Sequence, residues 1–480
     1  MSERSPSTLA ALATVLGEDA RVLGDGSVTV TSVSHESQAI APGSSTLFAC
    51  LRGEHHDGHH YAADAVAHGA RALLVDHPLP ILQPTAQLVV ADTRRAVGPL
   101  AARVYGQPAD DMTTVGITGT NGKTTTSHLL ATILRAAGRS TAVFGTLSGA
   151  RTTPEAPELQ QRLADARDHG DEAVVMEVSS HALALHRVDG TRFDAALFTN
   201  LGEDHLDLHG TAEEYFRAKA RLFRAAFTDV GVINADDAHG QLLLDVGGID
   251  MVAYSRGEVS DVQVGAGAHS FTWRGRRVDV AIGGGFNVMN SLAAATTAAV
   301  LGIDEDTIVD GLTDAEPVPG RFERVLGVED RGVAVVVDYA HTPDGLAEVL
   351  AAGRAVLRGG RLIVVFGAGG DRDHAKRPHM GAVAARLADR VVVTSDNPRS
   401  EDPEAIIAEI VAGMPTDGSA VVEIEARRDA AIGAAIRGAR PGDLVIIAGK
   451  GHETSQTIGD ATIEFDDRVV ARRVLGGDAA

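Results

Sequence analysis

The sequence has 480 residues, a length that predicts two to four domains at about 100–200 residues per domain. Its 43 Lys+Arg stand against 65 Asp+Glu, and the formal net charge of −22 repels nucleic acid and anionic membranes, so we expect no nucleic-acid partner. Cys50 is the only cysteine, which excludes an intramolecular disulfide, and no apolar window of about 18 residues predicts membrane insertion, so we expect a cytoplasmic protein.

Short β-branched runs recur along the chain, and each leads into a polar or glycine-rich loop and then an Ala/Leu-rich helical pattern. This alternation predicts βαβ units with buried parallel sheets, that is, an α/β fold. The predicted strands are 114–117, 173–178, 195–199, 230–233, 333–338, 361–366, 390–394 and 444–448. Ligands of such sheets bind beyond the carboxyl ends of the strands, so the loops after these runs are the candidate site.

Two proline-containing breaks, at 107–111 and 314–320, indicate domain joints. We therefore predict three domains, at 1–108, 109–318 and 319–480. Within the middle one, the segment 253–282 is β-like with turn signals, and we expect it to form an antiparallel addition.

The strongest local motif is Val-Gly-Ile-Thr-Gly-Thr-Asn-Gly-Lys-Thr-Thr-Thr at 115–126, between a predicted strand and a helical pattern. Backbone N–H groups at such a turn bind phosphate, Lys123 can reach the β- and γ-phosphates, and Thr124 can ligate Mg²⁺. Ile117 stands where the usual P-loop spacing has glycine. The alternative is a plain glycine turn before a helix, but Gly-Lys-Thr in this context favours a nucleoside triphosphate site.

Two further candidate ligands lie at or just after the ends of the next two predicted strands. Glu177 offers oxygen to Mg²⁺, and His205 offers nitrogen to a second ion. Either residue alone could equally well cap a helix. Together, at neighbouring strand ends beside the P-loop, they favour a metal site.

Five motifs occur in an order found in the Mur ligases, the ATP-dependent amide-forming enzymes of peptidoglycan precursor synthesis. They are Gly-Thr-Asn-Gly-Lys-Thr at 119–124, Glu-Val-Ser-Ser-His at 177–181, Thr-Asn-Leu at 199–201 with Asp-His-Leu-Asp at 204–207, Asp-Tyr-Ala-His-Thr-Pro at 338–343 and Gly-Lys-Gly-His-Glu at 449–453. The chain resembles this family from Ser37 to its C-terminal helix. The resemblance implies an N-terminal UDP-binding domain, a central P-loop ATPase domain with a parallel sheet, and a C-terminal Rossmann-like domain that receives an amino acid.

The resemblance also implies roles at the nucleotide. ATP would be bound by Gly119, Thr120, Asn121, Gly122, Lys123, Thr124, Thr125, Asn287, Arg321 and Asp338. Catalytic roles would fall to Lys123, Glu177, His205 and Lys219. Lys219 would be carbamylated and, with Thr124, Glu177 and His205, would hold Mg²⁺. From the helical pattern alone, Lys219 would be a solvated lysine.

For the UDP-sugar dipeptide, the resemblance implies hydroxyl and guanidinium contacts, which suit phosphate and carboxylate groups. The matching residues are Ser37, Thr152, Thr153, Ser179 and Arg187. Two positions depart from the family pattern: Gln38 replaces an Arg, and Leu185 replaces a Gln found in many members.

The motif Asp396-Asn397-Pro398-Arg399 indicates the amino acid, because in the family it marks the members that use meso-diaminopimelate. That substrate has a distal carboxylate, absent from lysine, that a guanidinium can bind with two hydrogen bonds. By the same resemblance, Arg372, Gly449 and Glu453 would complete the pocket. A solvated arginine in a proline turn is the alternative.

Two further patterns favour ordinary surface structure. His55, His56, His59 and His60 have no nearby ligand pattern that completes a metal site, and we expect exposed loop histidines. The glycines at 367–370 lack the third glycine of a dinucleotide fingerprint.

We therefore expect a monomeric ligase whose partners are ATP, Mg²⁺, meso-diaminopimelate and UDP-N-acetylmuramoyl-L-alanyl-D-glutamate. The D-glutamate γ-carboxylate would be phosphorylated, and the diaminopimelate amine would attack the acyl phosphate. The alternatives are a lysine-adding or other amide ligase of this fold, such as a folylpolyglutamate synthase, or a P-loop ATP switch without ligase chemistry.

Overall fold

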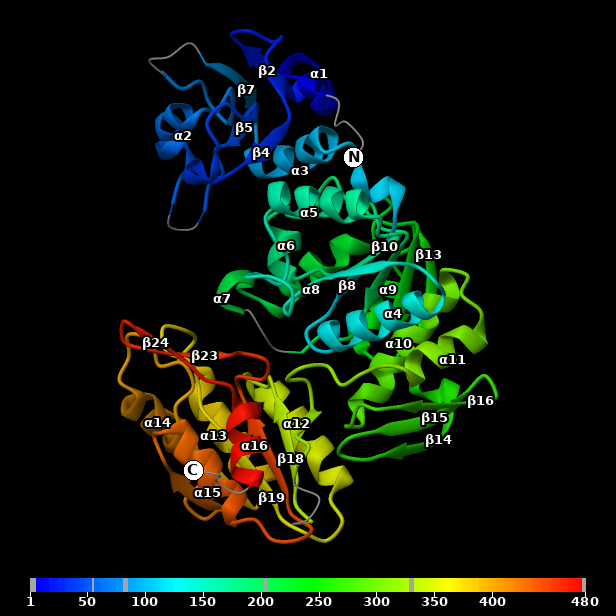
Figure 1. Cartoon of the computed structure of the whole chain (residues 1–480), viewed down its shortest axis with the longest axis vertical. Coiled ribbons are helices and arrows are strands. Elements are labelled where there is room, and N and C mark those ends of the chain that lie inside the picture. Colours follow the sequence, from blue (N-terminus) through cyan, green and yellow to red (C-terminus); the bar gives the residue numbers. More distant parts are fainter. Residues whose placement is uncertain (1–5, 54–55, 81–84, 203–205, 328–331, 477–480) are drawn as a thin grey trace.

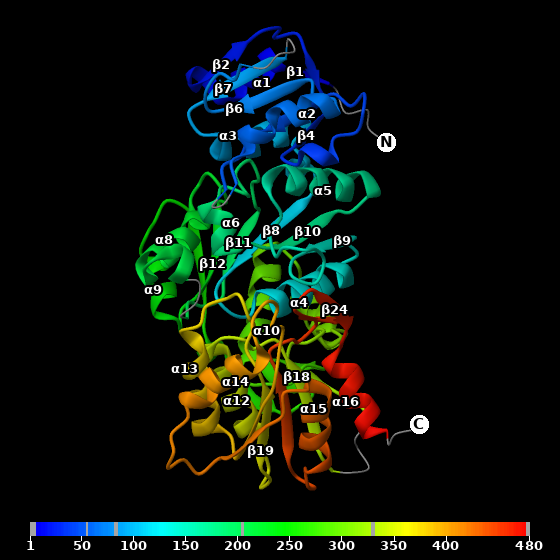
Figure 2. The same cartoon turned by 90° about the vertical axis from the view of Figure 1, so that its left-hand side faces the viewer.

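The computed structural model describes residues 6–53, 56–80, 85–202, 206–327 and 332–476. Three α/β parts follow one another along the long axis of the molecule, in chain order (Figures 1 and 2). None of the helices in these ranges is long and apolar enough to cross a membrane.

The first part is built on a five-stranded sheet in the order β2-β7-β6-β5-β4, parallel except for β2. The sheet strands are β2 (Ala20–Leu23), β4 (Ser32–Ser34), β5 (Thr46–Ala49), β6 (Ala72–Val75) and β7 (Ala86–Val90). A separate two-stranded sheet pairs β1 (Ser7–Thr8) with β3 (Thr29–Val30). Its helices are α1 (Leu9–Leu16), α2 (Ala62–His68) and α3 (Thr93–Val104). Apolar residues fill both faces of the sheet, with Leu47, Leu74 and Leu88 on one and Phe48 and Leu73 on the other.

The central part holds six parallel strands in the order β13-β12-β11-β8-β10-β9. They are β8 (Thr113–Thr118), β9 (Thr141–Phe144), β10 (Ala173–Glu177), β11 (Ala195–Phe198), β12 (Val230–Asn234) and β13 (Asp250–Tyr254). The helices are α4 (Lys123–Ala136), α5 (Ala156–His169), α6 (Ser180–Ala184), α7 (Leu206–His209), α8 (Ala212–Ala220), α9 (Ala238–Leu244), α10 (Phe286–Val300) and α11 (Glu305–Thr313). β8 lies in the middle of the sheet, so the P-loop lies at its centre.

A small antiparallel sheet packs beside α10 and α11 in the central part (Figure 1). It consists of β14 (Val259–Val264), β15 (His269–Trp273) and β16 (Arg276–Val280). The expected antiparallel addition is therefore present, but its predicted start at 253 is wrong. Ala253 and Tyr254 pair in parallel with β12 instead, because they continue the apolar edge strand β13.

The third part has a six-stranded sheet in the order β17-β18-β22-β19-β20-β21, in which β17 alone is antiparallel. Its strands are β17 (Glu323–Arg324), β18 (Ala334–Asp338), β19 (Leu362–Phe366), β20 (Arg390–Val393), β21 (Val421–Ile424) and β22 (Leu444–Ala448), with a separate hairpin of β23 (Ser455–Ile458) and β24 (Ala461–Glu464). Its helices are α12 (Pro343–Val356), α13 (Lys376–Leu387), α14 (Pro403–Ala412), α15 (Arg428–Arg437) and α16 (Asp467–Leu475). Every residue of β19 and β22 is buried, as expected for inner parallel strands.

The connections between the parts lie where prolines interrupt the chain. Pro108–Asp111 forms a 3₁₀ turn before β8, and the second joint runs from the end of α11 to β17. Gly320 in this second joint has φ +66°, and a Cβ built there would lie 2.1 Å from the backbone nitrogen of His452. Only glycine fits this contact between the joint and the third part.

Candidate active site

The P-loop joins β8 directly to α4. Gly122 adopts φ +86°, and a Cβ there would lie 2.4 Å from Asn290 Oδ1, so the turn requires glycine. The backbone N–H of Asn121 donates to Asn200 Oδ1 at 2.9 Å, which fixes the turn against the loop after β11. Lys123 begins the helix, and its Nζ donates to the carbonyl oxygens of Gly119 and Thr120, both at 2.8 Å. The ammonium thus lies over the turn, where a phosphate would bind.

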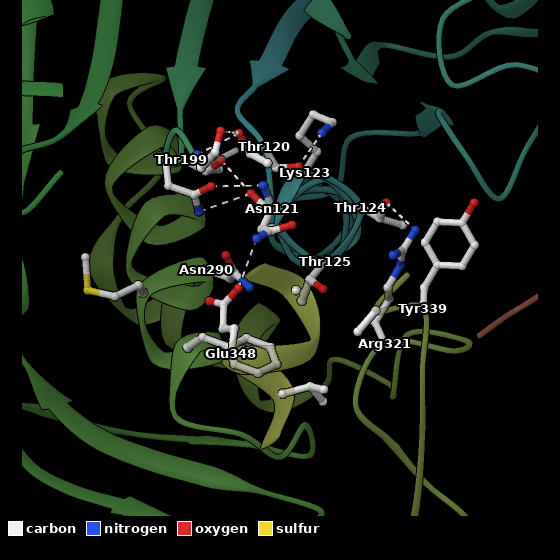
Figure 3. Close-up of a pocket in the computed structure, with 18 of the residues that line it drawn as sticks. Thr120, Asn121, Lys123, Thr124, Thr125, Thr199, Asn290, Arg321, Tyr339 and Glu348 are labelled. Carbon is white, nitrogen blue, oxygen red and sulfur yellow. Dashed lines mark hydrogen bonds between the residues drawn. The ribbon is translucent and has the colours of Figure 1, made fainter. Parts of the chain in front are cut away.

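A cavity of about 550 Å³ opens over this loop, between the central and third parts (Figure 3). From the central part it is lined by Thr120–Thr125, Thr146, Thr152, Glu177, Thr199–Gly202 and Asn290, among others. From the joint and the third part it is lined by Arg321, Asp338–Thr342 and Glu348, among others. The central and third parts therefore both contribute to one cavity of a size that suits a nucleotide.

Glu177 and Thr124 meet inside this cavity. Glu177 ends β10, is 1% exposed, and accepts hydrogen bonds from Thr124 Oγ1 at 3.1 Å and from the Thr146 backbone N–H at 2.9 Å. A carboxylate and a hydroxyl are hard oxygen donors, the ligand type that Mg²⁺ prefers, so these residues fit the ion. His205, the other expected protein ligand, lies outside the described residues.

Lys219 lies at the same loop, although it comes from α8. Its side chain is buried, with 1% of the residue exposed, so the interpretation of a solvated helical lysine is wrong. Its Nζ donates to Gly119 O at 2.8 Å and lies 4.5 Å from the ring centre of Tyr215. The structure thus brings Lys123 and Lys219 to one carbonyl oxygen.

Residues of the second joint reach into the cavity from the opposite side. Figure 3 shows the Arg321 side chain between Thr124 and Tyr339. Arg321 donates to Thr124 Oγ1 at 3.2 Å, and its guanidinium lies 4.4 Å from the ring centre of Tyr339. Asp338 accepts from the backbone N–H groups of Phe322 and Ala340, and burial raises the pKa of its carboxyl. Arg321 therefore connects the third part to the P-loop.

Asn287 takes a different place from the other expected ATP residues. It is completely buried in α10, and it does not line the cavity. Its Oδ1 instead accepts from Asn290 Nδ2 at 2.8 Å, and Asn290 does line the cavity. Asn290 was missed, although its spacing of three residues from Asn287 puts both on one helix face.

Glu348 is a second residue that sequence reasoning missed. It lies on α12, and its Oε2 accepts from Asn121 Nδ2 at 3.1 Å, which joins the third part to the P-loop. Burial, together with the nearby Asp338 charge, raises the pKa of Glu348 to about 7. The residue had no signal in the sequence, because its burial arises only when α12 packs against the central part.

Three of the expected UDP-substrate residues come together on the other side of Glu177. Thr153 Oγ1 donates to Glu177 O at 2.9 Å and accepts from the Ser179 backbone N–H at 3.0 Å. Arg187 donates to Thr153 O at 3.3 Å and pairs with Glu155 at 2.8 Å. Thr152 bonds to Thr146, at the cavity, whereas Ser37 lies in the first part and donates to Asp64 at 2.6 Å.

The residues expected to bind the amino acid lie on three loops of the third part, after β19, β20 and β22. Asn397 Nδ2 donates to Glu453 Oε2 at 2.8 Å. A Cβ built on Gly449 would lie 2.6 Å from Asp396 Oδ2, so the two loops touch. Pro398 packs on Gly370, where a Cβ would lie 1.9 Å from the Pro398 carbonyl oxygen.

Arg399 and Arg372 complete this group. Arg399 has φ +52°, which is strained for a side-chain-bearing residue, and its guanidinium donates to Gly370 O at 2.6 Å. Arg372 lies on the neighbouring loop and is exposed. A Cβ built on Gly369 would lie 3.0 Å from the Arg399 guanidinium and 3.9 Å from Arg372 Cγ, so both arginines lie beside this glycine.

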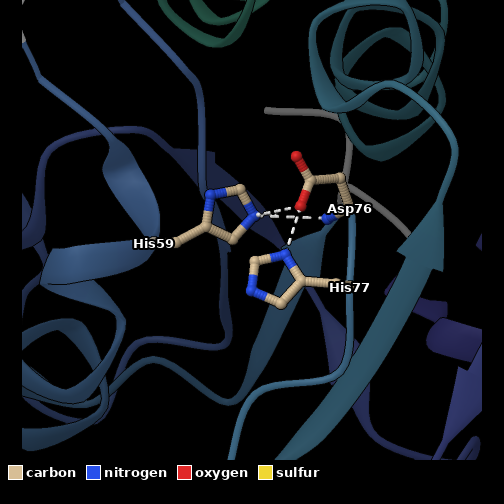
Figure 4. A group of neighbouring side chains, drawn as sticks. All are labelled: His59, Asp76 and His77. Carbon is tan, nitrogen blue, oxygen red and sulfur yellow. Dashed lines mark hydrogen bonds and ion pairs between the residues drawn. The ribbon is translucent and has the colours of Figure 1, made fainter.

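The histidine-rich loop of the first part forms no free metal site among its described residues. His59 is 8% exposed, so the expectation of an exposed loop histidine is wrong for this residue, whereas His56 and His60 are exposed and His55 lies outside the described residues. His59 lies beside Asp76 and His77, as Figure 4 shows. One potential ligand atom from each of the three side chains lies within 4.8 Å of the other two. However, His59 Nδ1 lies 2.5 Å from Asp57 Oδ1, and Nε2 accepts from the Asp76 backbone N–H at 3.2 Å. Both ring nitrogens are therefore engaged in holding the loop.

Three family models match successive stretches of the chain. The Mur ligase family, catalytic domain model matches residues 29–105, the Mur ligase middle domain matches 117–298, and the Mur ligase, glutamate ligase domain matches 320–451. Together they span most of the sequence.

Curated relatives match over nearly the whole length. A UDP-N-acetylmuramoyl-L-alanyl-D-glutamate–2,6-diaminopimelate ligase of Streptomyces avermitilis is 43% identical over 97% of this chain and 96% of its own. The enzyme of the same name from Synechococcus elongatus is 45% identical over 93% and 94%.

Solved structures agree with the fold. A structure of a ligase with that name has a TM-score of 0.68 and 31% identity, covering 98% of this chain and 99% of its own. Folylpolyglutamate synthase of Mycobacterium tuberculosis has a TM-score of 0.60 at 20% identity over 80% and 95%, a likeness of fold alone. These matches confirm the expected three-domain α/β architecture.

Proposed function

The chain belongs to the Mur ligase family, and on this premise we propose that it adds meso-2,6-diaminopimelate to the D-glutamate γ-carboxylate of UDP-N-acetylmuramoyl-L-alanyl-D-glutamate. Family members are ATP-dependent ligases that form amide bonds, and the chain is an enzyme of this class. The product would be a peptidoglycan precursor.

The observation that carries this choice of amino acid is the loop 396–399 beside Glu453. Asn397 of this loop donates to Glu453, and Arg399 follows it two residues later. Arg399 would offer its guanidinium to a carboxylate of the amino acid, and Glu453 would offer its carboxylate to an ammonium group. Meso-diaminopimelate has one more carboxylate than lysine, so a guanidinium that pairs with this additional carboxylate favours meso-diaminopimelate over lysine. The names of the full-length relatives support the same substrate.

The proposed reaction begins with the γ-phosphoryl group of ATP, which passes to the D-glutamate γ-carboxylate and gives an acyl phosphate and ADP. The diaminopimelate amine then attacks the acyl carbon, the amide bond forms, and inorganic phosphate leaves with the acyl C–O bond broken and takes up the proton that the amine loses. Lys123 and Arg321 face the phosphate region from opposite sides, and both can stabilise charge on the transferring group. Mg²⁺, held by Thr124 and Glu177, would neutralise phosphate charge.

Lys219 is proposed to carry a carbamate. The described contact of its Nζ with Gly119 O is compatible with this, because a carbamylated nitrogen keeps one N–H that can donate to the carbonyl. The added carboxylate would extend beside the P-loop and supply oxygen ligands to a metal. His205 is proposed as a further ligand.

The decisive experiment incubates the protein with MgATP, the UDP-dipeptide and a panel of amino acids, and identifies products by mass. We expect product with meso-diaminopimelate and phosphate release that requires both organic substrates. Product with lysine instead would favour the lysine-adding alternative, and ATP hydrolysis without any product would favour a switch. We also propose that the enzyme is cytoplasmic and monomeric. Size-exclusion chromatography with light scattering measures its molar mass and so checks the oligomeric state.

A further inference from the structure

Lys450 is a buried lysine to which the proposed reaction gives no role. It lies between Gly449 and Gly451, after β22, and is 0% exposed. The two glycines have φ +115° and +54°, and a Cβ on Gly451 would lie 2.7 Å from Tyr339 Cβ. This turn directs the Lys450 side chain into the protein, in a sequence that holds only four lysines, at 123, 219, 376 and 450.

The ammonium of Lys450 has three donors and three acceptors around it. Nζ donates to Ser455 O at 2.6 Å, to Glu453 Oε2 at 3.0 Å and to Asn397 Oδ1 at 3.3 Å. Two of these acceptors belong to side chains expected to bind the amino acid. The lysine therefore lies behind the pocket and contacts the groups that form it.

These contacts determine which atoms of Asn397 and Glu453 remain available. Asn397 Oδ1 also accepts from the Thr457 backbone N–H at 3.0 Å, so its Nδ2 must point toward Glu453 Oε2, to which it donates at 2.8 Å. Glu453 Oε2 thus accepts from both Lys450 and Asn397. The Glu453 side chain is 33% exposed, whereas Lys450 is closed off, so the open side of the pair belongs to the carboxylate.

We propose that Lys450 is a positioning residue of the amino-acid pocket. It holds the Glu453 carboxylate by Oε2, so that Oε1 faces the pocket and binds an ammonium group of the amino acid. This inference rests on the proposed function, because it assigns an amine-bearing substrate to the same pocket. Lys450 acts through Glu453 and Asn397 and does not touch the substrate.

A buried ammonium is destabilising unless it is paired, so removal of its charge should change the positions of the side chains that pair with it. Without it, the Glu453 carboxylate loses a charge-assisted hydrogen bond and can rotate, and Asn397 loses the contact that selects its orientation. The Michaelis constant for the amino acid should then rise. The constants for ATP and the UDP-dipeptide should not, because the expected contacts of both lie elsewhere.

The test is a double-mutant cycle of Lys450→Met, Glu453→Gln and the double variant, with Lys376→Met as the matched control. We expect Lys450→Met to raise KM for meso-diaminopimelate about 10-fold, with KM for the other substrates within about 2-fold. In the Glu453→Gln background, the same substitution should change KM by less than about 3-fold, because the partner charge is already absent. Lys376→Met should behave as wild type.

An unchanged KM in Lys450→Met, or an equal effect in both backgrounds, would overturn the proposal. If Lys450→Met does not fold, as judged by circular dichroism, Lys450→Gln retains a donor and should show the same coupling at smaller size. Failure of both variants to fold would assign Lys450 to stability alone and also overturn the proposal. Absence of product in the wild type would instead reject the proposed function, which keeps the two outcomes apart.

Discussion

The P-loop cradle takes its groups from one strand, one turn and one helix, whereas the residues proposed to form the amino-acid pocket come from separate loops of the third part. In the cradle, Gly119 to Thr124 are contiguous, and Lys123 donates to carbonyl oxygens three and four residues before it. In the pocket, Asn397 and Glu453 meet across 56 residues, and a buried lysine connects them. A phosphate cradle can therefore be read from a short motif, but the pocket depends on the packing of the whole sheet.

The difference also concerns how each site connects to the rest of the protein. The cradle is completed from outside, by Arg321 and Glu348 of the joint and the third part. The pocket is completed from within one part, by the hairpin of β23 and β24, where the Arg399 backbone N–H donates to Thr457 O at 3.0 Å. We expect substitutions at the cradle to affect catalysis, and substitutions in the pocket to affect the choice of amino acid.

The largest expected effect is that of Lys123→Ala. The variant loses the cation over the turn that would stabilise the transferring phosphoryl group, and product formation should fall about 1,000-fold. The measurement is the initial rate at saturating substrates. Lys376→Ala, at the start of α13 and outside the cavity, is the control and should retain wild-type activity. A Lys123→Ala rate near that of wild type would contradict the P-loop assignment.

Lys219→Ala should lower the rate about 100-fold, the upper range for a group that supports a metal site. Formate or acetate should restore part of the activity, because a small carboxylate can occupy the space of the proposed carbamate. The same acids should leave Lys123→Ala inactive, which serves as the control. If they rescue neither variant and the wild type keeps its rate in carbon-dioxide-depleted buffer, the carbamate is absent from the mechanism.

Arg399→Ala tests the pocket side of the comparison. Loss of a charge-assisted contact costs about 2 kcal/mol, which should lower kcat/KM for meso-diaminopimelate about 30-fold. The value for lysine should not fall, because lysine has no distal carboxylate. The ratio of kcat/KM for the two amino acids is the readout, and Arg427→Ala, an exposed arginine of the same part, is the control. An unchanged ratio would mean that Arg399 only forms part of a turn and does not select the amino acid.

The effect expected to change activity least concerns Glu348 and the dependence of stability on pH. Because the folded protein raises the pKa of this carboxyl from 4.5 to about 7, the unfolded chain releases the proton first as pH rises. The free energy of unfolding should therefore fall between about pH 4.5 and 7, by about 3 kcal/mol for this group. Glu348→Gln removes that dependence. Its melting temperature should exceed that of wild type by several degrees at pH 8 and match it at pH 4.

Melting curves at both pH values check this prediction. A constant difference between the two proteins across the range would mean that Glu348 does not titrate there. In that case, its hydrogen bond with Asn121 would be an ordinary contact between an amide and a carboxylate.

The sequence predicted the inner strands of the central and third sheets, because buried parallel strands are continuous β-branched runs followed by glycine loops. The strands at 230–233 and 444–448 illustrate this, since they lie within or match β12 and β22. The sequence predicted neither the edge strands of these sheets nor any strand of the first part. The helix after the P-loop begins at Lys123, inside the motif at 115–126 and not after it, because the turn at Gly122 passes directly into helical backbone.

Other features could not be predicted from local patterns. Glu348 looks like an ordinary charged residue in the sequence, and Lys450 belongs to the motif at 449–453 without an assigned role. Only the packing of distant segments desolvates the first and buries the second. His59 is similar, because its burial depends on Asp76, 17 residues away. The placements of Asn287 and Lys219 show that a family pattern can mark a position without revealing its contacts.

The scarcity of lysine has a practical consequence for chemical labelling. Of the four lysines, Lys219 and Lys450 are closed to solvent. An amine-specific acylating reagent should therefore modify these two positions only when the structure around them opens. The extent of acylation at residue 450, followed by peptide mapping, would then report the opening of the third part directly, without an enzymatic assay. In the same way, isotope-enriched carbon dioxide would find few competing side-chain amines, so that a carbamate resonance could be assigned with little overlap.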